Sequence, residues 1–251
     1  MEREKRPVTI VTGGSRGIGA ATVLALARAG HDVAFSYRSD GEAAERVRTA
    51  ATELGGRCLS FQAEVTREQD VERIFGEAAE LGSVTGLVSN AGLTAHIGDL
   101  ADTPVEVIRE VIDVNLVGVV LCARQAARVM SVRRGGRGGA IVNVSSGAAT
   151  LGSPHEYVHY AAAKAGVDAL TVGLAKELAG DGIRVNAVAP GIVNTEIHAA
   201  AGAPDRARPA VSRIPMGRLA EPDEIAPAIV WLLGPEASYA TGAVLRVAGG
   251  V

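Results

Sequence analysis

The 251-residue sequence predicts an α/β fold, in which a parallel sheet of about seven strands is wound on both faces by helices. Short runs rich in β-branched residues alternate with longer stretches rich in Ala and Leu. The short runs are apolar along their whole length, which is typical of strands buried on both faces. No linker-like composition divides the chain, so residues 1–251 are expected to form a single domain.

Each expected element follows from this alternation. The expected strands lie at 8–12, 32–37, 57–65, 86–90, 140–146, 183–190 and 243–249. The helices between them are expected to begin near Gly17, Gly41, Arg67, Thr103, Tyr157 and Glu221. The segment 194–220 is rich in Ala, Pro and Arg and breaks the alternation, so it is predicted to form a flap over a substrate.

Composition excludes several classes of function. A net charge of −3, a pI near 6.0 and only 3% aromatic residues give no basis for binding nucleic acid or an anionic membrane. No run of 18 apolar residues is present, so no membrane span is expected. Cys58 and Cys122 are far apart, and the histidines show no metal-ligand spacing. The sequence therefore predicts a cytoplasmic protein without a metal site.

A glycine turn joins the first strand to the first helix. The stretch "TGGSRGIG" (12–19) places Gly13, Gly17 and Gly19 where a strand gives way to a long helix. Glycines there allow a sharp turn and a close approach of the backbone to a diphosphate, which the N–H groups of the helix N-terminus bind. The sequence thus predicts a dinucleotide site that includes Ser15 and Ile18.

The end of the second strand indicates which dinucleotide. A site for NAD places Asp or Glu there to bind the ribose hydroxyls, but this chain has Tyr37, Arg38 and Ser39. Arg38, together with Arg16 in the glycine turn, is suited to bind a 2′-phosphate. These residues favour NADP(H).

Tyr160 and Lys164 are expected to share one face of a helix over 157–179 because they are four residues apart. Lysine is scarce, since Lys5, Lys164 and Lys176 are the only lysines among 25 basic residues. A neighbouring ammonium is expected to lower the pKa of the Tyr160 phenol, which would then exchange a proton with a carbonyl or alcohol oxygen. Tyr157 has no such partner and is expected to be packing or pocket wall.

These motifs give the chain a family resemblance. From about residue 7 to 250 it resembles the single-domain, classical form of the short-chain dehydrogenases/reductases, which have a Rossmann-type fold. The resemblance rests on six ordered motifs: "TGGSRGIG" (12–19), "SNAG" (89–92), "DVNLVG" (113–118), "IVNVSS" (141–146), "YAAAK" (160–164) and "PGIVNT" (190–195). Bacterial 3-oxoacyl-thioester reductases and glucose-dehydrogenase-like members are the most similar in appearance.

The resemblance implies the catalytic set Asn115, Ser146, Tyr160 and Lys164. Ser145 competes with Ser146. Strand alternation would turn only one of the two toward the cleft, and counting back from Gly152 favours Ser146. Asn115 is expected to hold a local distortion of its helix.

The remaining matched positions imply contacts with the coenzyme. Asn90, Ala91 and Gly92 are expected at the adenosine ribose, and Glu64 and Val65 at the adenine, where the family usually has Asp-Val. The nicotinamide is expected to lie against Pro190, Gly191, Val193 and Thr195. Tyr160 and Lys164 are expected to contact the coenzyme as well.

The resemblance implies an NADPH-dependent carbonyl reductase, or an alcohol dehydrogenase in the reverse direction, that assembles as a homotetramer. A sugar or polyol dehydrogenase remains an alternative, as does a non-catalytic sensor or scaffold that binds NADP(H). A carrier-protein thioester would favour a basic entrance, for which Arg206, Arg208 and Arg213 are candidates. Ala248 stands where the family usually has Asp, which leaves the usual subunit contact of the last strand open.

Overall fold

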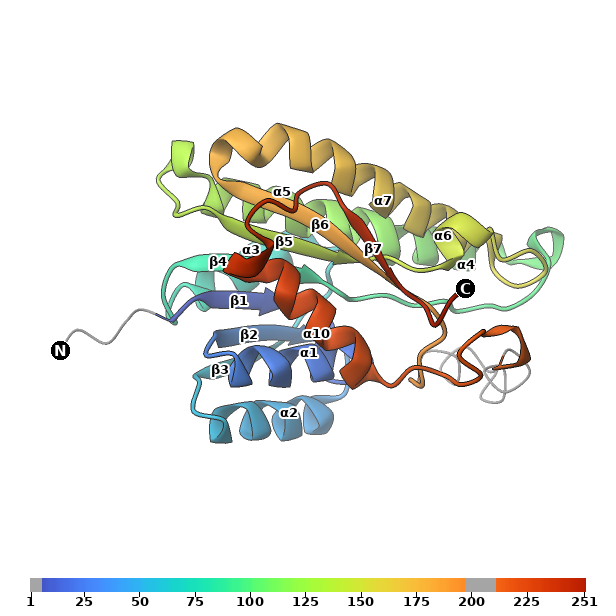
Figure 1. The fold of residues 1–251 in the computed structure, drawn as a ribbon, viewed down its shortest axis with the longest axis horizontal. Coiled ribbons are helices and arrows are strands. Elements are labelled where there is room, and N and C mark those ends of the chain that lie inside the picture. The colour runs from blue at the N-terminus through green and yellow to red at the C-terminus, as the bar shows by residue number, and fades with distance from the viewer. Residues whose placement is uncertain (1–5, 197–210) are drawn as a thin grey trace.

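A sheet of parallel strands runs through the centre of the molecule (Figure 1), and the computed structural model describes residues 6–196 and 211–251. Within these residues the sheet has seven strands in the order β3-β2-β1-β4-β5-β6-β7. The strands are β1 (Val8–Val11), β2 (Asp32–Tyr37), β3 (Cys58–Gln62), β4 (Val84–Ser89), β5 (Gly139–Val144), β6 (Ile183–Pro190) and β7 (Val244–Val247). The predicted α/β fold with about seven parallel strands is confirmed.

Helices cover both faces of this sheet. The helices are α1 (Gly17–Arg28), α2 (Gly41–Glu53), α3 (Glu68–Ala78), α4 (Val105–Ile112), α5 (Gly118–Met130), α6 (Ala148–Leu151), α7 (Val158–Leu178) and α10 (Pro222–Leu233). The helices α1, α2 and α10 lie on one face, whereas α5 and α7 lie on the other, together with α3 (Figure 1).

The apolar core forms two layers, one on each side of the sheet. Successive strand residues point to opposite faces, so Ile10 packs with α3, α5 and α7, whereas Val11 packs with α1, α2 and α10. Strands that bury both faces in this way read as continuous apolar runs, which is why the sequence pattern predicted a covered parallel sheet.

The chain changes direction across the sheet between β1 and β4. From β1 it continues outward to β2 and β3, and it then returns to β4 on the other side of β1. At such a switch point the connections leave the carboxyl ends of the two central strands in opposite directions and open a crevice between them. The glycine turn after β1 and the "SNAG" motif at the end of β4 both border this crevice.

The long helix expected from Thr103 onward is interrupted. Between α4 and α5 lies a π-helical segment, Asp113–Val117, with Asn115 at its centre. The Asn115 Nδ2 group donates to the Val111 carbonyl at 2.8 Å and to the Leu93 carbonyl at 2.7 Å, and its Oδ1 atom accepts from the Leu93 N–H at 3.2 Å. The helix is therefore distorted where the sequence predicts it.

Several strands end earlier than expected, among them β3 and β5. β3 ends at Gln62 instead of 65, because its partner β2 ends at Tyr37 and the chain then turns toward α3. β5 ends at Val144, so both serines lie beyond the strand. Of the expected flap 194–220, the part 197–210 lies outside the described residues, as do Arg206 and Arg208.

Candidate active site

The glycine turn after β1 approaches the end of β4 closely. Gly13 has a φ of +66°, a left-handed conformation that glycine adopts without strain, and a Cβ on Gly19 would overlap the Gly13 carbonyl oxygen. The Asn90 side chain donates to the carbonyl oxygens of Thr12 and Gly13, both at 3.0 Å. The N–H groups at the start of α1 are thereby held facing the crevice, as binding of a diphosphate requires.

Thr12 is a site residue that the sequence motifs did not indicate. Its Oγ1 atom accepts from the N–H groups of Asn90 at 2.9 Å and Ala91 at 3.0 Å, which ties the glycine turn to the β4 end. A threonine directly before a glycine turn was the available signal, but only the neighbouring strand shows what it binds.

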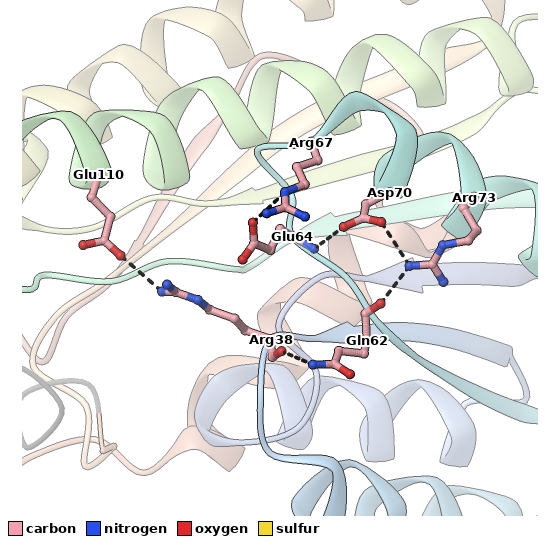
Figure 2. A network of polar contacts seen from close by, with 7 residues as sticks. All are labelled: Arg38, Gln62, Glu64, Arg67, Asp70, Arg73 and Glu110. Carbon is pink, nitrogen blue, oxygen red and sulfur yellow. Dashed lines mark hydrogen bonds and ion pairs between the residues drawn. The ribbon is translucent and has the colours of Figure 1, made fainter.

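Two arginines extend over the rim of the crevice. The Arg38 side chain reaches from the end of β2 to Glu110 on α4, 3.2 Å away, as Figure 2 shows, and Arg16 lies 3.4 Å from Glu196. All four side chains are largely exposed, so these ion pairs are weak and a dianion can compete for either guanidinium.

The residues expected at the adenine are tied to α3. The Glu64 carboxylate lies 2.9 Å from Arg67, and the backbone N–H of Glu64 donates to the Asp70 carboxylate at 2.9 Å (Figure 2). Arg73 continues this network from α3 to the Gln62 carbonyl at 2.7 Å. The chain just after β3 is thus fixed beside the crevice, with the Glu64 side chain directed to Arg67.

Tyr160, Ser146 and Lys164 meet at the base of the crevice. The Tyr160 hydroxyl is hydrogen-bonded to Ser146, and the Lys164 Nζ atom lies 5.7 Å from the centre of the Tyr160 ring. Lys164 donates to the Val144 carbonyl at 2.7 Å and is buried. Asn115 Oδ1 and Lys164 Nζ both lie beside Gly92, so all four predicted catalytic residues come together.

The pKa of Tyr160 differs from the sequence-based expectation. Burial raises the pKa of the phenol to about 12, and the hydrogen bond with Ser146 offsets only part of that rise. Burial also lowers the pKa of the Lys164 ammonium to about 8, while the charge of Asp168 opposes that fall. The expected fall of the phenol pKa is not seen in this structure, because desolvation dominates and Lys164 is not among the groups that shift the pKa of Tyr160.

The two candidate serines follow the end of β5, where backbone pairing with β6 continues, since the N–H groups of Ser145 and Gly147 donate to the carbonyls of Val188 and Pro190, both at 2.8 Å. Both serines border the crevice, but their hydroxyls have different partners. Ser146 is hydrogen-bonded to Tyr160, whereas Ser145 is buried and is hydrogen-bonded to Asp168.

Tyr157 forms part of the wall of the cleft, as expected. Its ring meets that of Tyr160 edge-to-face, with the ring centres 5.2 Å apart and the planes at 78°. Both rings pack with Leu93 and Ala95 in a small apolar cluster. Tyr157 therefore supports the position of Tyr160.

A family model described as enoyl-(acyl carrier protein) reductase matches residues 13–251. The uncharacterized oxidoreductase YgfF of Escherichia coli (strain K12) is 45% identical over 244 residues, which cover 97% of this chain and 99% of that protein. The chain belongs to the short-chain dehydrogenases/reductases. The 3beta-hydroxysteroid dehydrogenase 1 of Eggerthella lenta is 41% identical over 250 residues, covering 98% of this chain and 94% of that one.

Among solved structures, a short-chain dehydrogenase from Burkholderia cenocepacia J2315 in complex with NADP has a TM-score of 0.89 and 33% identity. The match covers 99% of each chain. Members of this family are oxidoreductases that bind a nicotinamide coenzyme, so this short-chain dehydrogenase/reductase is assigned to the oxidoreductases.

The crevice of this short-chain dehydrogenase/reductase fits such a coenzyme. It is a cleft of about 1240 Å³, larger than a typical site for a drug-sized ligand. The predicted residues that line it are Gly13, Ser15, Arg16, Gly17, Ile18, Tyr37, Arg38, Glu64, Val65, Asn90, Ala91, Gly92, Ser146, Tyr160, Lys164, Pro190, Gly191, Val193 and Thr195.

Three predicted residues do not line the cleft. Gly19 and Asn115 act behind its wall through the contacts described above, and Ser39 lies past the end of β2. Sequence reasoning missed Glu106, Arg109 and Glu110, which α4 brings to the same cleft. Nothing local marks these three, because their only relation to the site is the packing of α4.

The described residues contain no cluster of three or more His, Cys, Asp or Glu side chains arranged to hold a metal ion. In the same part of the chain, no helix combines the length and apolar character that crossing a membrane requires.

Proposed function

We propose that the protein is an NADP(H)-dependent carbonyl reductase, which interconverts a ketone and a secondary alcohol with Tyr160 as the general acid and base. The observation that carries this proposal is the Tyr160 hydroxyl, bonded to Ser146 and close to the buried Lys164 ammonium at the base of the cleft. A non-catalytic sensor would not need all four members of the catalytic set in this arrangement.

The four residues have separate tasks in the proposed reaction. Bound coenzyme supplies or accepts the hydride at its nicotinamide ring. Ser146 donates a hydrogen bond to the substrate oxygen and orients it toward Tyr160. Tyr160 gives its hydroxyl proton to that oxygen during reduction and takes it back during oxidation. Lys164 stabilises the phenolate that results. Asn115 maintains the π-helical segment between α4 and α5 through its hydrogen bonds with Leu93 and Val111.

The raised pKa of Tyr160 bears on the proposed proton transfer. With a pKa of about 12, the phenol is protonated at neutral pH, as the general acid of a reduction must be. A raised pKa also makes the phenol a weaker acid, so proton transfer in either direction depends on stabilisation of the phenolate, which the Lys164 ammonium would assist.

Coenzyme choice rests on the two rim arginines. Arg16, in the glycine turn after β1, and Arg38, just after β2, both border the cleft. The end of β2 has no acidic residue. The related structure solved with NADP supports the same choice. The Glu64 carboxylate is paired with Arg67, which offsets part of its repulsion of a 2′-phosphate.

The cleft walls beside Tyr160 support an apolar substrate. Leu93 and Tyr157 pack with Tyr160 in this part of the cleft, and Leu151 also lines the cleft. A related dehydrogenase acts, by its name, on the hydroxyl group of a steroid, a secondary alcohol on an apolar ring system. We therefore favour an alicyclic or long-chain ketone over a sugar or polyol. The flap 194–220 is proposed to close over this substrate.

We also propose a homotetramer located in the cytoplasm. Exposed apolar side chains on and beside α5 and α7, including Val117, Val120 and Val172, support burial against other subunits. The free thiols of Cys58 and Cys122 suit a reducing compartment. Light scattering at micromolar concentration should give the mass of four chains, and a monomer would contradict the proposed assembly.

The decisive experiment is a panel of carbonyl compounds assayed with NADPH and with NADH. We expect reduction of apolar ketones, a higher kcat/KM with NADPH, and little turnover of sugars. Tyr160→Phe should lose about 10²–10⁴-fold in kcat. Failure of every carbonyl, while NADPH binds normally, would instead support the sensor alternative.

A further inference from the structure

One turn beyond Lys164, the same face of α7 carries an acidic residue that the proposed mechanism does not use. Tyr160, Lys164 and Asp168 are spaced four residues apart, so they form a column with about 6 Å of helix rise between neighbours. Asp168 is partly buried, and its Oδ1 atom has no hydrogen-bond partner among the described residues. A carboxylate in such a place requires an explanation, because burying it is costly.

The surroundings of Asp168 connect it to the site. The Ser145 hydroxyl is hydrogen-bonded to the Asp168 carboxylate and lies 3.4 Å from the Lys164 backbone carbonyl. In the sequence, Ser145 is flanked by Val144 and Ser146. The Val144 carbonyl accepts from Lys164 Nζ, and Ser146 is hydrogen-bonded to Tyr160. Asp168 therefore touches the segment that positions both partners of Tyr160.

A second cation faces Asp168 from the edge of the sheet. Arg246 on β7 interacts electrostatically with Asp168, donates to the Gly147 carbonyl at 3.2 Å and contacts Thr150 Oγ1. The Asp168 carboxylate thus interacts with the buried Lys164 ammonium on its own helix and with the exposed Arg246 side chain on β7. Without Asp168, the buried ammonium would lose this opposite charge.

We propose that Asp168 is a positioning residue of the active site, whose carboxylate keeps the Lys164 ammonium charged and held beneath Tyr160. The catalytic consequence rests on the proposed function, whereas the electrostatic link between the two side chains does not. The direction of the pKa effect on Lys164 agrees with the geometry, because the Asp168 charge opposes the lowering that burial causes.

The test measures the protonation of Lys164 directly. Lys5, Lys164 and Lys176 are the only lysines, so protein made with lysine isotope-labelled at the ε-carbon has three lysine signals. Lys5→Arg and Lys176→Arg assign two of them by loss of signal. NMR titration of the coenzyme-free protein then gives the midpoint of Lys164 without any need for activity.

We expect Asp168→Asn to lower the Lys164 midpoint by about 1 pH unit or more, because a nearby opposite charge stabilises the charged form. Asp168→Glu, which keeps the charge, should restore most of the difference. Asp168→Ser provides a second neutral variant if asparagine is not accommodated, and Ser145→Ala should give a smaller shift by releasing the carboxylate. Circular dichroism verifies that each variant is folded.

Asp181→Asn is the matched control. Asp181 is a buried carboxylate that accepts hydrogen bonds from Ser131 at 2.8 Å and from Arg133, and it lies beyond the far end of α7. The Asp181→Asn variant should leave the titration midpoint of Lys164 unchanged. The proposal is overturned if the neutral variants at 168 that fold titrate like the wild type, or if Asp181→Asn shifts Lys164 equally.

Activity provides a separate readout. If the protein reduces carbonyls, the fall of kcat at high pH should move to lower pH in Asp168→Asn and return in Asp168→Glu. A normal pH profile combined with a shifted NMR midpoint would refute the catalytic role of Asp168. Absence of any carbonyl reduction by the wild type would count against the proposed function alone.

Discussion

Replacement of Lys164 by arginine keeps the positive charge and changes only its shape and acidity. Lys164 is 3% exposed, and its ammonium fits a space bounded by the Val144 carbonyl 2.7 Å away and the Tyr160 ring. A guanidinium is larger and planar, and overpacking of a buried site typically costs about 1–3 kcal/mol. Lysine also lowers the cost of burial by losing its proton near pH 8, whereas arginine remains charged.

The expected result is a stable but nearly inactive enzyme. Because the guanidinium displaces the phenol or the coenzyme ribose, Lys164→Arg should lose about 10²–10⁴-fold in kcat, comparable with Tyr160→Phe. The two losses should not add in the double variant, since both residues act on the same proton transfer. The melting temperature should fall by several degrees, as a cost of about 1–3 kcal/mol implies.

The assay follows carbonyl-dependent oxidation of NADPH by absorbance, alongside thermal unfolding. Lys176→Arg is the matched control, because it makes the same exchange at an exposed position on the same helix. It should leave both rate and stability unchanged. If Lys164→Arg keeps turnover within about tenfold of the wild type, the proposed role of the ammonium is refuted.

Four further outcomes are expected. Arg38→Asp should lower kcat/KM with NADPH by roughly 10- to 100-fold and spare NADH, and a wild type that prefers NADH would contradict the coenzyme assignment. Glu110→Gln should improve NADPH binding by about two- to fivefold, measured by fluorescence titration, because it releases the Arg38 guanidinium from an exposed ion pair. Tyr157→Phe should cost under about tenfold in kcat, and a loss equal to that of Tyr160→Phe would mean that the wrong tyrosine has been assigned. Between about pH 8 and pH 10 the folded chain has released a Lys164 proton that the unfolded chain still binds. Lys164 therefore makes the free energy of unfolding rise with pH over this range. Denaturant titrations should show a weaker rise in Lys164→Met.

Much of the site was predictable because its residues follow the ends of strands. In a parallel α/β sheet the carboxyl ends of all strands meet at one edge, so motifs after consecutive strands come together. Gly13, Arg38, Asn90 and Thr195 follow four different strands, and all line one cleft. The pairing of Tyr160 with Lys164 depends only on helical periodicity, which is local.

The structure departs from the sequence-based expectations at strand boundaries and in the solvation of buried groups. Strand ends depend on where the neighbouring strand stops, and β3 and β5 therefore end at Gln62 and Val144, earlier than the sequence pattern indicated. The pKa of Tyr160 depends on how completely surrounding elements exclude water, and burial is the largest influence on it. A local sequence pattern contains neither quantity.

The sequence by itself determined the α/β fold class, the coenzyme cleft and the four residues proposed for catalysis, because periodicity and strand-end motifs are short-range properties of the chain. Only the tertiary structure decided which charges stand opposite these residues. Glu110 meets Arg38 across 72 positions of sequence, and Arg246 comes from the last strand to face Asp168. Such contacts arise from the packing of whole elements, and their electrostatic strength is set by burial, which exists only in the folded protein.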